Sequence, residues 1–466
     1  MRPFTLVFLI LCFASLTLFL LSCSSKNSSM QMASVQVSLS DPATCSAPQG
    51  PFSHIYVTVT DVRIHQSANA SDNDSGWVDL APGLANSPVQ VDLLGASTQC
   101  FLKMLGSQQI QAGAYQQIRI LLADNSASVS GNHCGSTANC VVVASDPMNP
   151  RALRLSSESK TGIKIPPGQI AGGKFVVAAG ESKDLDLDFN ACRSIVTEGN
   201  GSFRLKPVLH AGEVAQQSAI SGTVIDAGTQ APIQGGNTVV ALERNEGSGV
   251  DRVVMETVTD ASGAFSFCPV ANGTYDVVVT AIHGAGGAYA ATVITAVPSS
   301  GALGKVPLTA VLAPASIMGA ITTSTGSSAT SADLTLSALQ GITENGSNLL
   351  VTVPLAAQSA SSATLTTAPG MSCAANTDCV SYTLSVPAAN PSVGAFRNSG
   401  NQSPAAPTAG PVNYTLDAMA FVPGAAGQLD CTPSEQQTNQ TSSSAPLSVS
   451  AGMSVTAATL AFTGCN

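Results

Sequence analysis

Short segments in which apolar and polar side chains alternate constrain the fold of this chain more than any other feature. Between Ile55 and His65, apolar side chains occupy odd positions as far as Val59 and even positions from Val62. A repeat of two residues is that of a β-strand with one buried face, and the change of phase near Asp61 predicts a β-bulge. Similar segments recur between Gly-, Pro- and Ser-rich stretches along all 466 residues. We therefore expect an all-β protein with three β-sandwich-like domains in series.

The low content of charged residues supports this fold class. Only 10% of the residues are charged, which leaves long helices too few polar side chains for their solvent-facing surfaces. The net charge is −10, and the 18 Lys and Arg residues form no run. Binding to nucleic acid requires a concentrated cationic surface, so we expect no nucleic-acid partner.

The N-terminus has the pattern of a lipoprotein signal peptide. Residues 4–21 carry no charge, and Leu20-Leu21-Ser22-Cys23 resembles the lipobox, at which lipoprotein signal peptidase cleaves before an acylated cysteine. We expect residues 1–22 to be this signal peptide and residues 23–34 to be a polar tether. Diacylglycerol and an N-acyl chain such as palmitate on Cys23 would anchor the chain to a membrane. The alternatives are a plain signal peptide and an N-terminal membrane helix.

Ten cysteines follow Cys23, and an even number in an exported chain favours disulfides. Two pairs have five small or polar residues between them, a spacing that a disulfide closes into a surface loop. The expected pairs are Cys134 with Cys140, Cys373 with Cys379, Cys431 with Cys465, and Cys45 with Cys100. Cys192 and Cys268 remain, and they either connect two domains or stay buried and free. Zinc sites use shorter spacings, so we expect no metal at these cysteines.

A series of short blocks characterises residues 35–214. They are the strand before Asp41-Pro42, the strand from His54 to His65, Val91–Leu94, Ile110–Arg119, Leu185–Phe189 with Ser194–Val196, and Leu205–Val208. In this order the blocks resemble the bacterial domain of unknown function 4382 family. The resemblance implies a β-sandwich-like domain on exported lipoproteins and no known chemistry.

Residues 219–312 contain a turn that closes a small β-sandwich. Asp260 can accept backbone N–H groups in this turn, Gly263 can adopt a positive φ, and Asn272-Gly273 allows a tight return into the next strand. The aromatic residues that alternate into the core are Phe265, Phe267 and Tyr275. The pattern is similar to the carboxypeptidase regulatory-like (transthyretin-like) domain, which implies a fold and no peptidase chemistry.

Residues 315–466 resemble no named family. Strand-like segments recur in them, separated by Gly-, Ser-, Ala- and Pro-rich stretches at 357–371, 387–411 and 433–447 that we interpret as long loops. We expect a third β-rich domain, again a β-sandwich.

The segment 184–190 holds the strongest candidate for a metal site. On a strand, the side chains of Asp184, Asp186 and Asp188 point to one face, where their carboxylates could bind Ca²⁺. We favour the competing interpretation, a half-exposed strand with its carboxylates in solvent and no metal. Asp72–Gly76 begins like a calcium loop but lacks the acidic twelfth ligand, so we interpret it as a polar loop beside Trp77. A tryptophan here is more typical of a sandwich edge than of a ligand platform.

The sequence contains no combination of residues that indicates catalysis. Ser157–Lys160 fits the S-x-x-K pattern but has none of the companion motifs. We expect no enzyme activity, no cofactor, and a lipid-anchored protein of the cell envelope facing the periplasm or the exterior. Its expected role is binding, adhesion or structure, with a protein or glycan partner. The alternatives are a carbohydrate-associated accessory protein and a hydrolase with a dispersed site.

Overall fold

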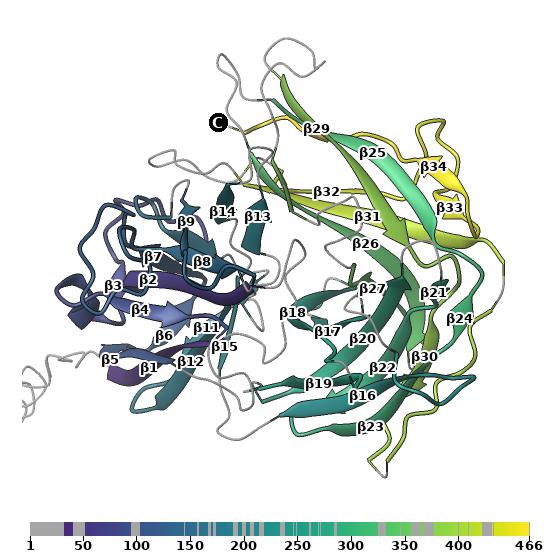
Figure 1. Ribbon diagram of the computed structural model, residues 1–466, viewed down its shortest axis with the longest axis horizontal. Helices are drawn as coiled ribbons and strands as arrows, with labels where there is room; N and C mark the ends of the chain where they lie inside the picture. Colours follow the sequence, from purple (N-terminus) through teal and green to yellow (C-terminus); the bar gives the residue numbers. More distant parts are fainter. Residues whose placement is uncertain are drawn as a thin grey trace, which may run out of the picture.

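The computed structural model of the chain is built almost entirely of β-strands, which confirms the expected fold class (Figure 1). It describes residues 32–40, 52–94, 103–143, 145–155, 158–165, 169–170, 174–189, 194–197, 202–205, 209–213, 219–233, 238–245, 247, 249–260, 262–268, 270, 272–283, 287–324, 332–344, 346–355, 364–366, 377–398, 400–408, 410–421, 431 and 433–465. Within these ranges, no helix is long and apolar enough to cross a membrane. The leader, the Asp41-Pro42 turn and Ser157 lie outside the described residues.

Two sheets enclose the core of the first unit, which we define as residues 32–213. One sheet has the strand order β15-β12-β1-β5, and the other follows β10-β7-β2-β8-β9-β14-β13. Apolar side chains from both sheets meet in a single core, as Val37, Ile64 and Leu187 illustrate. The elements are β1 (Met32–Ser40), β2 (Phe52–His65), β3 (Val78–Asp79), the 3-10 turn η1 (Pro82–Ala85), β4 (Val89–Asp92), β5 (Lys103–Gln111), β6 (Gly113–Tyr115), β7 (Gln117–Leu122), β8 (Cys140–Val143), β9 (Arg151–Arg154), β10 (Ile163–Ile165), β11 (Phe175–Val177), β12 (Ser182–Phe189), β13 (Ile195–Thr197), β14 (Phe203–Leu205) and β15 (Leu209–Glu213).

Strand β2 organises the larger sheet of this unit. Its pairing with β7 changes register between Val59 and Asp61, which confirms the predicted bulge. Val59 and Val62 are three residues apart, so in a regular strand they would point to opposite faces. The extra residue of the bulge lets both point into the core.

The second unit, residues 220–311, is a smaller sandwich. The sheet β19-β16-β23 covers strands β17, β18, β20 and β22, and the predicted aromatic residues Phe265, Phe267 and Tyr275 lie in the core between them. In the predicted turn, the Asp260 carboxylate accepts the backbone N–H groups of Ser262 and Ala264. The elements are β16 (Ile220–Asp226), β17 (Thr238–Asn245), β18 (Val250–Val258), β19 (Ala264–Phe267), β20 (Thr274–His283), β21 (Gly287–Tyr289), β22 (Thr292–Pro298), β23 (Ala302–Leu308) and β24 (Ala310–Val311).

Gly263 explains why this turn is so tight. Its φ is +76°, and a Cβ atom at this position would lie 2.5 Å from the carbonyl oxygen of Val224. Only glycine fits both the backbone conformation and the close approach of the neighbouring strand.

The third unit, residues 315–465, packs the sheet formed by β29, β25, β34 and β35 against β26 and β31. Its core contains Ile317, Leu336 and Leu416. The elements are β25 (Ala315–Ser324), β26 (Asp333–Glu344), β27 (Ser347–Val353), β28 (Thr364–Thr366), β29 (Thr377–Val386), β30 (Ser392–Ala395), β31 (Val412–Phe421), β32 (Glu435–Thr438), β33 (Ser448–Val449), β34 (Ser454–Thr456) and β35 (Leu460–Phe462).

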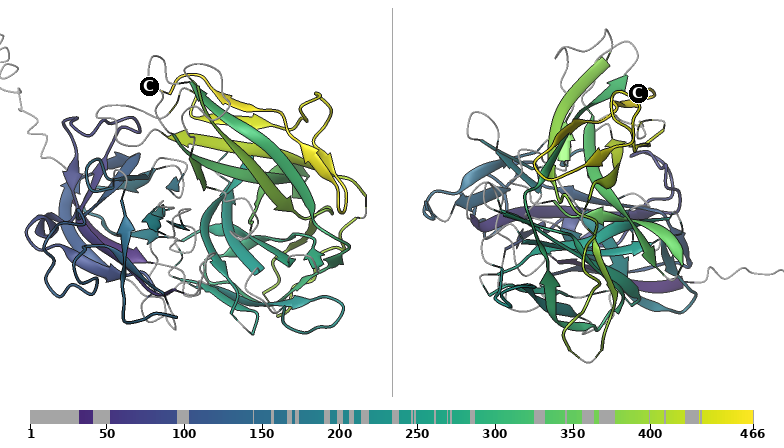
Figure 2. Two further views of the ribbon diagram at one scale, coloured as in Figure 1. Left: turned by 45° about the horizontal axis from the view of Figure 1, so that its top comes forward. Right: turned by 90° about the vertical axis from the view of Figure 1, so that its right-hand side faces the viewer.

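The second and third units share one sheet, which the sequence did not predict. Strand β18 pairs in parallel with β27, and β22 pairs in parallel with β30, so that strands of both units form one 13-stranded sheet. A small apolar cluster between the units contains Val278, Val293, Ile342 and Val351. Figures 1 and 2 show the first unit lying beside this joined pair.

Candidate functional site

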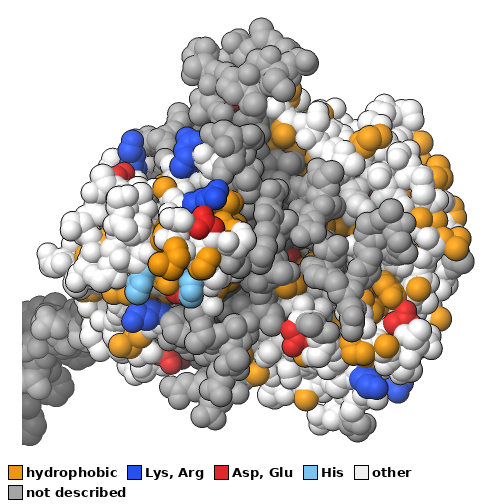
Figure 3. All heavy atoms as spheres, in the orientation of Figure 1, with side chains coloured by type: hydrophobic (Ala, Val, Ile, Leu, Met, Phe, Trp, Pro, Cys, Tyr) orange, Lys and Arg blue, Asp and Glu red, His pale blue; other side chains and the backbone are white. Residues whose placement is uncertain are grey.

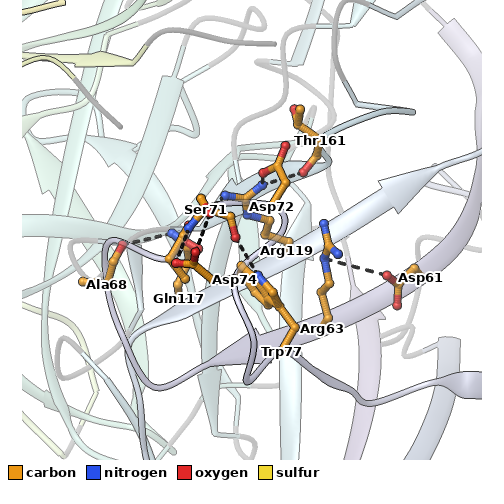
Figure 4. Close-up of polar contacts among 11 residues, drawn as sticks. Asp61, Arg63, Ala68, Ser71, Asp72, Asp74, Trp77, Gln117, Arg119 and Thr161 are labelled. Carbon is orange, nitrogen blue, oxygen red and sulfur yellow. Dashed lines mark hydrogen bonds and ion pairs between the residues drawn. The ribbon is translucent and has the colours of Figure 1, made fainter. Parts of the chain in front are cut away.

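A cluster of polar and aromatic side chains surrounds Trp77 on the outer face of the large sheet of the first unit (Figure 4). Arg63 of β2 and Arg119 of β7 occupy paired positions on neighbouring strands. Their guanidinium carbons lie 4.9 and 5.0 Å from the centroid of the indole ring. Such cation–π contacts stabilise the ring against the sheet.

The loop before Trp77 is held by its own hydrogen bonds. The indole N–H donates to the carbonyl of Ser71 at 2.8 Å, and the hydroxyl of Ser71 donates to Asp74 at 2.6 Å. These bonds from Ser71 hold the pKa of Asp74 below its usual value. The carboxylate of Asp72 forms an ion pair with Arg119. Both acidic side chains therefore have protein partners, that of Asp74 within the loop and that of Asp72 on β7, in agreement with the interpretation as a polar loop.

A second pair of acidic side chains, Asp61 and Asp79, lies at the bulge of β2. Burial and the neighbouring charge of Asp79 raise the pKa of Asp61 to about 6, although Arg63 opposes the shift. The Nε atom of Arg63 lies 3.9 Å from the Asp61 carboxylate. Asp61 therefore changes its charge in the mildly acidic range.

Three stacked rings form what we call the ring stack, His54, Tyr56 and His133, of which the two histidines are exposed and Tyr56 is half-buried. The centroids of His54 and Tyr56 lie 5.5 Å apart and those of Tyr56 and His133 lie 5.0 Å apart, with interplanar angles of 17° and 11°. His54 contacts the Asp92 carboxylate at 2.7 Å through Nδ1. Figure 3 shows histidine side chains at the surface of the first unit beside apolar and basic ones. No pattern in the sequence indicated this surface.

A short loop positions the third ring. Cys134 and Cys140 form a disulfide that closes the loop directly after His133. From β4, Gln90 accepts the backbone N–H of His133 at 2.8 Å and donates to Asn132 and to the carbonyl of Ala138. The loop is thus fixed by a covalent bond and by the half-buried amide of Gln90, which preorganises the ring stack.

The acidic strand β12 differs from the interpretation that we favoured. Asp184 is half-buried, but Asp186 and Asp188 are only 6% and 3% exposed, so their carboxylates do not lie in solvent. These two carboxylates are buried by tertiary packing, because strand β18 of the second unit contacts β15, the neighbour of β12. Burial raises the pKa of Asp186 to about 7. Within the described ranges, no three His, Cys, Asp or Glu side chains are arranged to hold a metal ion.

Two of the predicted disulfides are confirmed, Cys134–Cys140 and Cys431–Cys465, with Cα–Cα distances of 5.5 and 4.0 Å. Cys268 and Cys379 are disulfide-bonded as well, so the alternative of a buried free thiol is wrong for Cys268. The other cysteines considered for disulfides, Cys45, Cys100, Cys192 and Cys373, lie outside the described residues, and so does the lipidation candidate Cys23.

Comparison with known families supports the resemblance of the first unit. Residues 32–207 match a family described as "Domain of unknown function (DUF4382)". A search among curated proteins finds no match. The similarity of the second unit to the carboxypeptidase regulatory-like domain stays a prediction.

The solved structures to which this chain is matched share little sequence with it, and their TM-scores are low. The Bacillus anthracis TIE protein is 10% identical over 94% of this chain, with a TM-score of 0.16, and this chain spans about half (51%) of its length. The shaft pilin SpaA from Lactobacillus rhamnosus GG is 12% identical, with 60% of this chain and 98% of the pilin covered and a TM-score of 0.17. The minor pilin GBS52 from Streptococcus agalactiae is 13% identical, with 60% and 97% covered and a TM-score of 0.17. Such low scores leave the function to be argued from this chain itself.

Proposed function

We propose that the protein is anchored to a membrane by lipid on Cys23 and serves outside the cytoplasm in binding, adhesion or structure. The observation that carries the proposal is the disulfide bonding of six described cysteines, Cys134, Cys140, Cys268, Cys379, Cys431 and Cys465. Disulfides persist in oxidising compartments and are rare in the cytosol. The apolar residues 4–21 supply the export signal, and the lipobox-like Leu20–Cys23 at their end supplies the lipidation signal.

The ring stack is the surface that we assign to partner binding. Its rings project from a rigid sheet and a disulfide-closed loop, and rigid aromatic side chains give large contact area at low entropic cost. Trp77 is a weaker candidate because the guanidinium groups of Arg63 and Arg119 already contact its ring. A carbohydrate ligand would need an open ring face, which the ring stack offers only at its two ends.

Lipidation is tested by expressing the full chain and its Cys23→Ala variant in a bacterium supplied with radiolabelled palmitate. We expect label and membrane association for the parent chain, and for the variant an unlabelled band of lower mobility that retains the leader. Equal mobility of the two proteins, without label in either, would contradict the proposal.

Partner binding is tested with the same full chain and a Tyr56→Ala, His133→Ala double variant. The two proteins are compared on a glycan array and in pull-downs from cell-envelope extract. Loss of one specific protein band with the double variant supports adhesion through the ring stack, and loss of a glycan signal supports the carbohydrate alternative. The matched control is Gln116→Ala, which replaces a side chain remote from the ring stack that donates to the carbonyl of Gln66.

A further inference from the structure

Acidic side chains are buried where the first unit packs on the second. Asp186 and Asp188 of β12 are two residues apart and share one face of the strand. Asp188 is paired in register with His210 of β15, which contacts β18, and Glu256 lies on β18. We call this group the acid junction. All four side chains are less than 9% exposed, with Asp188 at 3%.

The carboxylates of β12 have few hydrogen-bond donors. The Ser40 hydroxyl donates to Oδ2 of Asp186 at 2.6 Å, while among the described residues no side chain or backbone group donates to Oδ1 of Asp186 or to either carboxylate oxygen of Asp188. An ionised carboxylate without donors is strongly disfavoured away from water, whereas its protonated form is tolerated. The geometry therefore favours a protonated Asp188.

The surrounding elements bring more acid than base to this group. Strand β1 contributes the uncharged side chains of Ser38 and Ser40, and β17 contributes the buried Glu243. The cations of the neighbouring elements are largely engaged elsewhere. Lys183 of β12 pairs with Glu213 of β15 at 2.8 Å. Arg252 of β18 pairs with Asp417 at 2.7 Å. Lys164 of β10, which contacts β15, is half-exposed. His210 is the titratable base within the junction.

The charges of the junction reinforce the effect of burial. Burial raises the pKa of Asp188 well above its usual value, and the carboxylates of Asp186 and Glu256 raise it further. Since Glu256 belongs to the second unit, part of the electrostatic repulsion acts across the contact between the two units.

We propose that the acid junction makes the packing of the first unit on the second unit proton-dependent, closed when its carboxyl groups are protonated and loosened when they ionise. The closed arrangement is then the acidic form of the molecule. When the pH rises, ionised Asp186 and Asp188 recover hydration as β12 separates from Glu256 on β18. The first unit then moves as a body relative to the joined second and third units, whose shared sheet stays intact.

The test measures a distance between the first and second units of the full chain in detergent. Spin labels are attached through non-canonical amino acids at the exposed positions Asn86 and Ser300, so that the disulfides are untouched. Electron–electron double resonance at about pH 5.5 and about pH 8.5 should show one narrow distance and then a second, longer one. The longer population should increase about tenfold per pH unit for each proton released, until it saturates.

Two variants separate this mechanism from a general effect of pH. The double variant Asp188→Asn, Glu256→Gln should lose most of the pH dependence, because only Asp186 of the three acids can still ionise. Asp184→Asn, on the same strand but half-exposed, should behave like the parent chain. If the double variant fails to fold, the single variants are measured in the same way, and each should reduce the pH dependence.

Three results would overturn the proposal. They are a parent chain whose distance does not change with pH, amide variants that retain the full pH dependence, and a parent chain that opens at about pH 5.5 when EDTA is added. The last result would mean that a bound cation, rather than protons, neutralises the junction.

Discussion

Arg119 holds together three backbone segments of the first unit. Its guanidinium bonds the carbonyls of Ala70 at 3.1 Å and Thr161 at 2.8 Å, and it pairs with the carboxylate of Asp72. The side chain is only 7% exposed, and a cation in such a place is stable only while its donors are satisfied. The loop that covers Trp77 therefore depends on one buried charge.

Removing the partner of this charge should destabilise the first unit. Asp72→Asn keeps the size of the side chain but removes its charge, and we expect a loss of about 3 kcal/mol in the free energy of unfolding. Trp77 is the only tryptophan of the chain, so its fluorescence in a urea titration reports on this unit alone. Asp74→Asn, which changes an exposed carboxylate, is the control and should have a smaller effect. Equal losses for the two variants would contradict this role of Arg119.

Asp61 should make the stability of the first unit depend on pH. Its folded-state pKa of about 6 is above its ordinary value of 3.8, so the folded state binds the proton more tightly than the unfolded state does. The resulting stabilisation is complete below pH 3.8 and is lost as the pH rises through about 6. Asp61→Asn should flatten this part of the profile and raise stability at neutral pH by about 2 kcal/mol. A Trp77-detected profile that is unchanged in the variant would show that another group titrates.

At the scale of elements, alternation predicted strands best where one face meets a core and the other meets solvent. The segments 55–65 and 184–190 correspond to β2 and β12, and the bulge near Asp61 was visible as a change of phase. Strand β18 shows no clear alternation in the sequence, because a register shift near Met255 and the buried Glu256 disrupt it. The one sequence signal for this strand is Glu256, a charged residue among apolar ones. Such a residue indicates that the polar face of the strand is also buried.

The candidate sites were harder to predict than the strands. Asp186 and Asp188 were identified as site-like, but nothing in the sequence shows that the second unit covers their face of β12. The ring stack joins β2 to a loop almost 80 residues away along the chain, a proximity that only the fold creates. The sequence draws attention to Trp77 beside a polar loop. The two arginines that contact it are brought there by the pairing of β2 with β7, which the sequence does not show.

The disulfide-closed loop should be needed for the order of the ring stack. Replacing Cys134 and Cys140 by serine removes a short loop closure, which we expect to cost about 2 kcal/mol. The backbone would retain its bonds to Gln90, so the unit should still fold. Hydrogen exchange of residues 131–140 should accelerate relative to β7, and an unchanged exchange rate would argue against the role of the disulfide.

An ion pair connects the second unit to the third. Arg252 of β18 donates to Asp417 of β31 and to Glu435 of β32, each at 2.7 Å, and the Asp417 side chain is 1% exposed. Arg252→Met should therefore lower stability by about 3 kcal/mol, because it leaves a buried carboxylate without its cation. Calorimetry should show the loss in the transition of the joined units. Arg151→Met, at an exposed pair, is the matched control, and a similar loss there would contradict the assignment.

At the scale of the whole molecule, parallel pairing between distant segments joins two of the three units. Val250 of β18 pairs with Leu350 of β27, and Thr292 of β22 pairs with Ser392 of β30. Pairs so far apart in the chain leave no local pattern, which is why the sequence predicted separate domains in series.

The joined units should not be separable by truncation. A chain that ends after Leu312 lacks β27 and β30, so strands β18 and β22 gain open edges and the apolar side chains of Val278 and Val293 lose their cover. Open edges and apolar surface favour aggregation. We expect this truncated chain to be insoluble when the full chain is soluble, measured by centrifugation after refolding. A soluble, cooperatively unfolding product would show that the second unit is independent.

The strand order of the shared sheet also determines when the second unit can be completed during synthesis. Strand β22 acquires its neighbour β30 only after about a hundred further residues have been made. Contacts between such remote segments form slowly, because a large loop must close before they contribute. The half-finished sandwich therefore stays open to chaperones, and its maturation waits for the C-terminal third of the polypeptide.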